Sequence, residues 1–330
     1  MASIGKLRGL QQLSTPEGIL CILALDQRGT LQRMMEAAGW QDASYPVVVQ
    51  LKMEILQRLA PLVSGVLLDP LYSAAQAIAG GVLPGRVGLM VALEAGGYEA
   101  QGPDRLARVL DGWSVEKIKA MGASAVKLLV HYHPERTEAA RHQQRLVEQV
   151  AAECRRWDIP FLLEPVLYAP TEREEEDLRR RRAELVAETA RQLGRFPVDV
   201  LKLQFPVDPE VVPDGDAWEE ACRRVTEASP VPWALLSAGA PYDVFARQLE
   251  AACRAGASGF VAGRAIWQEA VQRRHDEEVR RRFLDEEMPL RIRRLVDIAR
   301  RHGRPWPAVA SHAHRLDMVG PDWYRTYREG

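Results

Sequence analysis

The segment GASAVKLLVHYHPERTEAARHQQRLVEQVAAECRRWDIPFLLE, residues 122–164, holds one full repeat of the pattern that decides the fold. Two short apolar runs, Ala125–His131 and Pro160–Glu164, flank an amphipathic stretch at Glu138–Trp157. Apolar runs without clean alternation are typical of strands buried on both faces, as in parallel sheets. The segment therefore predicts a strand, a helix and a second strand parallel to the first.

The same alternation continues in both directions along the chain. Six further apolar runs are predicted as strands: Ile19–Asp26, Gly65–Asp69, Val87–Glu94, Asp199–Gln204, Trp233–Ser237 and Ser258–Ala262. The other helical patterns cover Val47–Leu62, Val115–Met121, Glu174–Leu193, Ala217–Glu227 and Tyr242–Ala255. Because each parallel return needs a right-handed helical crossover, eight such units predict an α/β protein of the (β/α)8 TIM barrel class.

An open, doubly wound sheet is the alternative architecture. The glycine pairs Gly80–Gly81 and Gly96–Gly97 lack the GxGxxG spacing after a first strand that a dinucleotide site requires. We expect residues 1–275 to form the barrel. Residues 276–330 are expected to form a C-terminal helical extension and tail that pack on the barrel or on a partner subunit.

Composition argues against several classes of protein. With 47% hydrophobic residues and a net charge of −1 over 330 residues, the chain is neither a disordered protein nor a typical nucleic-acid binder. Apolar stretches such as Ile19–Leu25 are well short of the ~20 residues that span a bilayer, so no membrane association is expected. The N-terminus lacks the pattern of a signal peptide, and four scattered cysteines are typical of a reduced, cytoplasmic protein.

Lysine is rare in this chain, with six among 44 basic residues. Two of the six, Lys127 and Lys202, lie in predicted strands. Lysine, unlike arginine, can become a neutral nucleophile, so its position here indicates amine chemistry. The alternative is a pair of lysines that extend into a wet cavity.

Ionisable residues occur at the carboxyl ends of the predicted strands, where the reactive groups of this barrel lie. By alternation along each strand, Lys202 shares a face with Val200, Glu164 with Leu162, and Asp26 with Ala24. If these faces line the lumen, two lysines and two carboxylates meet there. Burying four such groups costs several kcal/mol unless they are paired, which favours a chemical role.

These residues suit a Schiff-base aldolase that needs neither metal nor cofactor. A lysine amine condenses with a ketone to give an iminium, which accepts the electron pair released by carbon–carbon cleavage. Lys127 would disfavour protonation of Lys202, Glu164 would take the hydroxyl proton, and Asp26 would hold the amine or substrate hydroxyls. The turns after the last two strands, Ser237-Ala238-Gly239 and Gly263-Arg264, are expected to bind phosphate.

Eight motifs in order resemble those of the tagatose-1,6-bisphosphate aldolase family, over roughly residues 15–270. They are DQRGTLQRMM (26–35), LLDPLY (67–72), ALEAGGYE (92–99), WSVEKIKAMGASAVKLL (113–129), DIPFLLEPV (158–166), RFPVDVLKLQFPVD (195–208), LLSAG (235–239) and GASGFVAGRAIW (256–267). Sulfofructose-phosphate aldolases share most of these motifs.

The resemblance assigns roles residue by residue. It implies Lys202 as the Schiff-base lysine and Glu164 as the acid/base. It also implies that Asp26 and Lys127 line the same site. Substrate binding is expected at Gln27, Arg28, Ser237, Ala238, Gly239, Gly263 and Arg264. One departure is Gln204, where the family pattern leads us to expect glutamate.

Several single residues have a second interpretation. Asp26 could be the N-cap of a helix at Gln27–Met35, and Ser237 could cap the helix after its strand. Asp69 and Glu94 could face substrate or orient their neighbours. The pairs His131/His133 and His312/His314 have a spacing that suits a metal, but the later strands offer no further histidine, so no metal site is expected and His131 would instead contact substrate.

The expected activity is reversible cleavage of a ketose 1,6-bisphosphate, above all tagatose 1,6-bisphosphate, to dihydroxyacetone phosphate and glyceraldehyde 3-phosphate. One alternative is cleavage of 6-deoxy-6-sulfofructose 1-phosphate. The other is a non-catalytic sugar-phosphate sensor, which Gln204 keeps open. The expected partner is a small-molecule sugar phosphate, and the chain is expected to form a homo-oligomer.

Overall fold

A closed barrel of eight parallel strands forms the centre of the computed structural model, which describes residues 3–101, 103–212, 215–309 and 319–327. The order around the barrel is β1-β10-β9-β8-β7-β6-β3-β2. The strands are β1 (Leu20–Leu25), β2 (Gly65–Leu68), β3 (Gly88–Ala92), β6 (Ala125–His131), β7 (Phe161–Val166), β8 (Val200–Leu203), β9 (Trp233–Leu236) and β10 (Gly259–Ala262). Each coincides with a predicted run, so the barrel prediction is confirmed.

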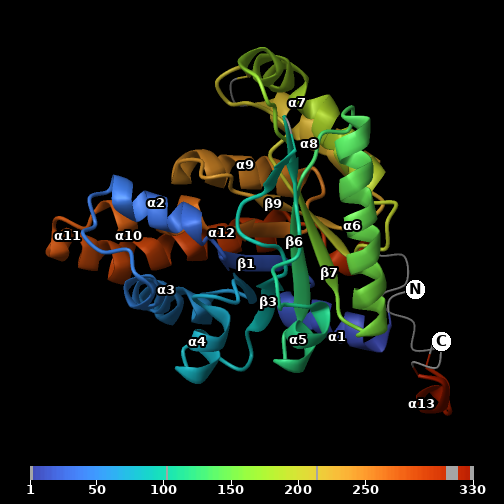
Figure 1. The fold of residues 1–330 in the computed structure, drawn as a ribbon, viewed down its shortest axis with the longest axis horizontal. Helices are drawn as coiled ribbons and strands as arrows, with labels where there is room; N and C mark the ends of the chain where they lie inside the picture. Colours follow the sequence, from blue (N-terminus) through green and yellow to red (C-terminus); the bar gives the residue numbers. More distant parts are fainter. Residues whose placement is uncertain (1–2, 102, 213–214, 310–318, 328–330) are drawn as a thin grey trace.

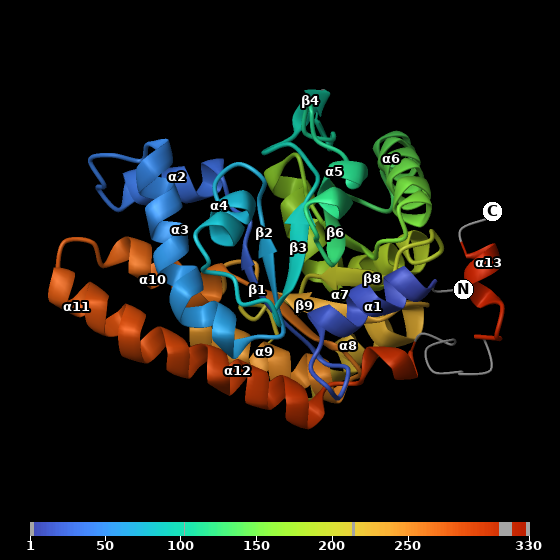
Figure 2. The ribbon, with the colours of Figure 1, turned by 90° about the horizontal axis from the view of Figure 1, so that it is seen from below.

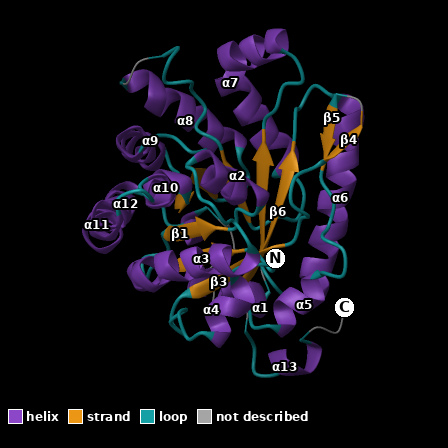
Figure 3. Ribbon diagram, turned by 60° about the vertical axis from the view of Figure 1, so that its left-hand side comes forward, coloured by secondary structure: helices purple, strands orange, loops and turns teal. Residues whose placement is uncertain are grey.

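Helices surround the barrel on its outside (Figures 1 and 3). They are α2 (Gly29–Ala37), α3 (Tyr45–Leu59), α4 (Ala74–Ala79), α5 (Val115–Ala120), α6 (Thr137–Arg156), α7 (Glu172–Leu193), α8 (Asp216–Ala228), α9 (Tyr242–Arg254) and α10 (Arg264–Gln272). A short 3-10 helix, η1 (Ala60–Leu62), follows α3. The long helices α6, α7, α8 and α9 each overlap a predicted helical stretch.

Alternation along the strands divides the apolar core into two parts. The side chains that fill the lumen are Leu20, Ile22, Ala24, Leu67, Met90, Ala125, Leu162, Val200, Ala234 and Val261. The residues between them on the same strands pack outward against the helices. Ala24, Leu162 and Val200 are the residues that were expected to share a face with Asp26, Glu164 and Lys202, so the predicted phase of these strands is confirmed.

A helix that was not predicted, α1 (Ile4–Leu13), closes the amino-terminal end of the barrel. Leu10 and Leu13 belong to the lumen cluster, and the helix contacts β1, β2, β3 and β6 (Figure 2). Lys6 on the same helix forms an ion pair with Asp199, with 2.7 Å between Nζ and Oδ2. The predicted site residues lie at the opposite, carboxyl end of the strands.

The chain beyond residue 275 continues the ring of helices. After α11 (Glu277–Arg282) and a π-helical turn, η2 (Phe283–Glu287), helix α12 (Met288–His302) packs against α9 and α3 and contacts β1 and β10 (Figure 2). Ile292, Leu295 and Ala299 of α12 join the same core as the other helices. Helix α12 thus stands where the eighth helix of the barrel belongs. Two short helices, η3 (Trp306–Ala308) and α13 (Trp323–Thr326), follow.

A second unpredicted feature is an antiparallel hairpin, β4 (Glu99–Gln101) and β5 (Asp104–Leu106), between β3 and α5. It lies beside α6 and β6, near the carboxyl end of β6 (Figure 3).

Within the described residues, no helix is both long and apolar enough to cross a membrane.

Candidate active site

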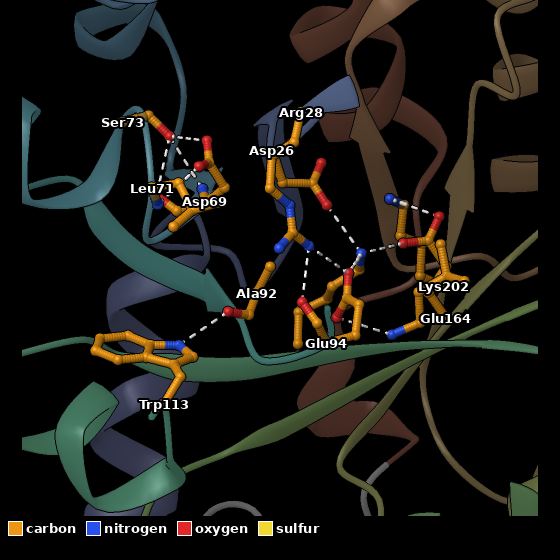
Figure 4. A network of polar contacts seen from close by, with 12 residues as sticks. Asp26, Arg28, Asp69, Leu71, Ser73, Ala92, Glu94, Trp113, Glu164 and Lys202 are labelled. Carbon is orange, nitrogen blue, oxygen red and sulfur yellow. Dashed lines mark hydrogen bonds and ion pairs between the residues drawn. The ribbon is translucent and has the colours of Figure 1, made fainter. Parts of the chain in front are cut away.

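Lys127, in the middle of β6, is the centre of a buried charge cluster in the upper lumen. Its Nζ lies 2.8 Å from Asp26 Oδ2, 2.6 Å from Glu94 Oε1 and 3.0 Å from Glu164 Oε2. Figure 4 shows these three carboxylates turned toward one another, one from β7 and two from the residues just after β1 and β3. Burial alone would lower the pKa of Lys127, but the three carboxylates outweigh it and raise that pKa well above its usual value. Lys127 is therefore a fixed positive charge.

Lys202 lies on β8, which is separated from β6 by β7 alone. It contacts one of the three carboxylates that surround Lys127. The Nζ of Lys202 lies 2.9 Å from Glu164 Oε1, so Glu164 bridges the two lysines with its two oxygens. Burial alone would raise the pKa of Glu164, yet Lys127 and Lys202 hold it below its usual value. The pKa of Asp26 is lowered against the effect of burial by the same two lysines. Both carboxylates are ionised at neutral pH.

Arg28 adds a third cation at the start of α2. Its Nη2 donates a hydrogen bond of 2.8 Å to the backbone oxygen of Glu94 and lies 3.8 Å from the Glu94 carboxylate. Three cations thus face three carboxylates, which keeps a deeply buried site electrically balanced.

Two polar atoms beside this cluster lack a partner. Within the described residues, Nη1 of Arg28 and Oε1 of Gln27 are buried and make no hydrogen bond. An unsatisfied buried polar atom is costly, so a bound ligand with oxygen atoms would stabilise this part of the site. Arg28 also occupies the N-cap position of α2, so the alternative interpretation of Asp26 as that cap is wrong.

The structure brings the two predicted phosphate turns together at the ends of β9 and β10. The backbone amide of Gly263 lies 3.5 Å from Ser237 Oγ. Ala238 and Gly239 both have positive φ, 49° and 84°, which bends the turn sharply. A side chain at Gly239 would begin 3.1 Å from the Arg264 guanidinium carbon, so glycine allows Arg264 to lie against this turn.

The alternative interpretation of Ser237 as a helix cap is wrong, because the N-cap of α9 is Pro241. Ala238 lies in the same turn, and because its side chain is a methyl group, only its backbone can form hydrogen bonds there. Ser237, Gly239, Gly263 and Arg264 thus form one group, separate from the Lys127 cluster.

Glu94 is a member of the cluster that the sequence left unassigned. Besides Lys127, its carboxylate accepts a 3.1 Å hydrogen bond from the backbone amide of Leu129. The signal in the sequence was its position at the end of a predicted strand, the same signal that marks Asp26.

Asp69 turns away from the cluster and orients other groups instead. It accepts hydrogen bonds from the Ser73 hydroxyl and the backbone amide of Leu71 (Figure 4). The amine of Lys52 and the backbone amide of Tyr72 also donate to it. Lys52, whose Nζ also donates to the Leu25 carbonyl at 2.9 Å, was not singled out from the sequence because it lies in a helical pattern.

Gln204 accepts a 2.7 Å hydrogen bond from the backbone amide of Leu167. Gln204, where the family pattern has glutamate, thus fixes the start of the loop that follows β7. Of the histidines, His131 ends β6 on the lumen side, whereas His312 and His314 lie outside the described residues. Within the described part of the chain, no three His, Cys, Asp or Glu side chains gather as metal ligands would.

Comparison with known proteins identifies relatives of this chain. A family profile described as DeoC/LacD family aldolase matches residues 20–269. A tagatose 1,6-diphosphate aldolase of Streptococcus agalactiae serotype V is 33% identical over 283 residues, which is 81% of this chain and 86% of the relative. A tagatose 1,6-diphosphate aldolase of Staphylococcus aureus strain bovine RF122 is 34% identical over the same shares.

Solved structures share the fold. An archaeal fructose-1,6-bisphosphate aldolase with its catalytic lysine bound to a carbinolamine intermediate matches with a TM-score of 0.59 and 20% identity, over 89% of this chain and 98% of that one. A fructose-bisphosphate aldolase from Plasmodium falciparum matches with a TM-score of 0.68 and 12% identity, over 90% of this chain and 94% of that one. At these identities the likeness establishes the barrel alone.

Proposed function

The chain belongs to the DeoC/LacD family of aldolases, and from this premise we propose that it cleaves tagatose 1,6-bisphosphate, a ketose 1,6-bisphosphate. The products are dihydroxyacetone phosphate and glyceraldehyde 3-phosphate, and the reaction is reversible. The substrate assignment is supported by the names of the two bacterial relatives. The mechanism is supported above all by one observation, the buried Lys202 amine with an ionised carboxylate, Glu164, 2.9 Å away.

In the first step, Lys202 loses a proton to Glu164 or solvent, and its free Nζ attacks C2 of the ketose. The proton returns to the C2 hydroxyl of the carbinolamine, which leaves as water to give a positively charged iminium, and Glu164 is again ionised. Lys127 cannot compete as the nucleophile, because three carboxylates hold its proton. Lys127 and Asp26 instead bind the substrate hydroxyls and keep Glu164 in place.

In the second step, the C3–C4 bond breaks. Glu164 takes the proton of the C4 hydroxyl, the aldehyde carbonyl forms, and the bonding electron pair moves into the iminium to give a neutral enamine. The loss of positive charge on the Lys202 nitrogen raises the proton affinity of Glu164 as it accepts this proton. Protonation of the enamine at C3 and hydrolysis then release dihydroxyacetone phosphate and the free lysine.

The remaining site residues bind the substrate. The C1 phosphate contacts Ser237, the backbone of Ala238, Gly239 and Gly263, and the Arg264 guanidinium. Donors of this kind suit a phosphate dianion. Gln27 and Arg28, whose buried polar atoms lack partners, bind oxygen atoms of the sugar.

Reductive trapping tests this mechanism. Sodium borohydride added with dihydroxyacetone phosphate should leave one adduct, located by mass spectrometry on Lys202, and cleavage should persist in EDTA. Lys202→Met should lose both adduct and cleavage, whereas Lys117→Met, on an exposed part of α5, should retain both. An adduct on Lys127 or a requirement for a divalent metal would refute the mechanism. Turnover by the wild type would also exclude a sensor without catalysis.

A further inference from the structure

We infer that Arg105 and His131 form a subsite for the second, distal anionic group of the substrate, a phosphate monoester or a sulfonate. The inference rests on the proposed function of the Lys202 site. It adds Arg105, from the hairpin β4–β5, and gives a specific role to His131, from β6, which was expected from the sequence only to contact substrate.

The position of His131 suits the far end of the substrate. It lies on the same face of β6 as Ala125, which fills the lumen, and Lys127, which lines the site. Four residues beyond Lys127, it is about 13 Å further toward the open end of the barrel at ~3.3 Å per residue. The subsite is thus above the reacting atoms rather than among them.

The order of strands places His131 far from the turns after β9 and β10 that are proposed to bind the C1 phosphate. In the closed barrel, β6 stands four strands from β10, on the opposite wall, and β8 with Lys202 lies between them. A ketose bound through C2 to Lys202, with its C1 phosphate at β9 and β10, therefore extends its other end toward β7 and β6. A distal anion needs a cation on that side.

Arg105 is a cation without a counter-ion. Within the described residues its guanidinium has no carboxylate partner and donates no hydrogen bond. It lies 5.1 Å from the centre of the Tyr98 ring and 5.4 Å from that of Tyr168. Two aromatic faces hold the group in place without consuming its N–H donors.

The neighbouring arginines differ in this respect. Arg108 pairs with Glu99 and with Asp111, each at 3.0 Å, and Arg136 pairs with Asp104 at 2.7 Å. A fork of free, oriented N–H groups is the arrangement that recognises phosphate and sulfonate oxygens.

His131 supplies a second, independent indication of a ligand. Its Nδ1 is buried and, within the described part of the chain, makes no hydrogen bond. Burial and the nearby Arg105 lower the pKa of His131 to about 4, so the ring is neutral at pH 7. The same tyrosines pack against it edge-on, with ring centres 5.1 Å away for Tyr98 and 6.1 Å for Tyr168. An N–H at Nδ1 can therefore donate to the same anion as Arg105.

The test compares two aldehydes in the condensation direction. With dihydroxyacetone phosphate as donor, glyceraldehyde 3-phosphate carries the distal anion and glyceraldehyde does not. For Arg105→Leu we expect kcat/KM with glyceraldehyde 3-phosphate to fall about 10- to 100-fold, the usual cost of a lost charged hydrogen bond. The rate with glyceraldehyde should stay unchanged, and Arg105→Lys should recover part of the loss.

Arg108→Leu is the matched control, because it removes the same charge next to the same hairpin from a guanidinium that is already paired and exposed. Both aldehydes should then react at rates within about 3-fold of the wild type. An equal loss with both aldehydes in Arg105→Leu would mean that Arg105 only stabilises the hairpin, and no loss with glyceraldehyde 3-phosphate would equally overturn the inference.

A third substrate shows whether the distal anionic group is a phosphate or a sulfonate. If the wild type cleaves 6-deoxy-6-sulfofructose 1-phosphate with a higher kcat/KM than tagatose 1,6-bisphosphate, the distal group is a sulfonate, and Arg105→Leu should lower that rate in the same proportion. Borohydride trapping of dihydroxyacetone phosphate on Lys202 should be normal in Arg105→Leu. Absence of the adduct in the wild type would contradict the proposed function rather than the distal subsite.

Discussion

Removal of the Lys127 amine would leave Asp26, Glu94 and Glu164 without their common partner. The three carboxylates contact that amine within 3.0 Å, and all three are buried. In the folded protein the pKa values of Asp26 and Glu164 are lowered, so their contribution to stability is present above the unfolded value of about 4 and is lost as the pH falls below it.

Lys127→Met should reverse this pH dependence. At pH 7 the free energy of unfolding should fall by about 3–5 kcal/mol, because buried carboxylates lose a cation. Since burial then raises their pKa values, the variant should become more stable between pH 7 and 5, where the wild type changes little. Urea denaturation followed by circular dichroism at both pH values measures the effect, with Lys117→Met as an exposed control. A variant with the pH slope of the wild type would contradict this account.

Strand alternation was sufficient to predict that Asp26, Lys127, Glu164 and Lys202 meet. It could not predict Lys52, because a lysine in an amphipathic helix has the same pattern whether it faces solvent or, as here, a buried Asp69. Arg105 was missed for a related reason. Its hairpin has two strands of three residues, too short to show a periodic pattern, and its role depends on ring faces that come from distant parts of the chain.

At the scale of elements, α1 is a lid on the amino-terminal end of the barrel. Leu10 and Leu13 bury their side chains among lumen residues such as Leu20. The segment Ile4–Leu13 gave no strong signal in the sequence, because two glycines and several polar residues interrupt its apolar face. The helix forms there because the open end of the barrel offers an apolar surface that only tertiary contact supplies.

Leu13→Ala should therefore lower the free energy of unfolding by about 2–5 kcal/mol, the usual range for a buried leucine. Ile4→Ala, on the same helix but 40% exposed, should change it by less than about 0.5 kcal/mol. The KM of both variants should equal that of the wild type, because α1 lies at the end of the barrel opposite to Lys202. Thermal unfolding and steady-state cleavage assays give the two values; a raised KM in Leu13→Ala would show that the two ends of the lumen are coupled.

For the whole molecule, the barrel is complete only with α12. The predicted end of the barrel is residue 275, where the eighth strand–helix pattern ends. The chain beyond that residue is rich in arginine, which favours its interpretation as a C-terminal extension of the barrel. On α12, Ile292, Leu295 and Ala299 pack inward. The exposed arginines of this helix are Arg293, Arg294, Arg300 and Arg301. The helix that follows β10 directly is α10, which has nine residues. Nothing in the sequence indicated that a later helix, α12, is the one that covers β1 and β10.

Leu295→Ala should lower hydrogen-exchange protection in β1 and β10 together, because α12 covers both strands. The expected loss of stability is about 2–5 kcal/mol. Leu290→Ala on the same helix, at a position that is 63% exposed, is the matched control and should leave protection unchanged. Protection lost only within α12 itself would show that residues 276–302 are an independent extension.

The pairing of β1 with β10 has a consequence for biosynthesis. Leu20 pairs with Gly259, so the first strand leaves the ribosome long before its partner exists. At about 5–20 residues per second, the intervening chain takes on the order of 10–50 s to synthesise. During that time β1 keeps one edge of bare backbone groups beside an apolar surface, the kind of template on which nascent chains aggregate. The exposed edge of β1 is therefore open to contact with other chains until β10 has been made and pairs with it.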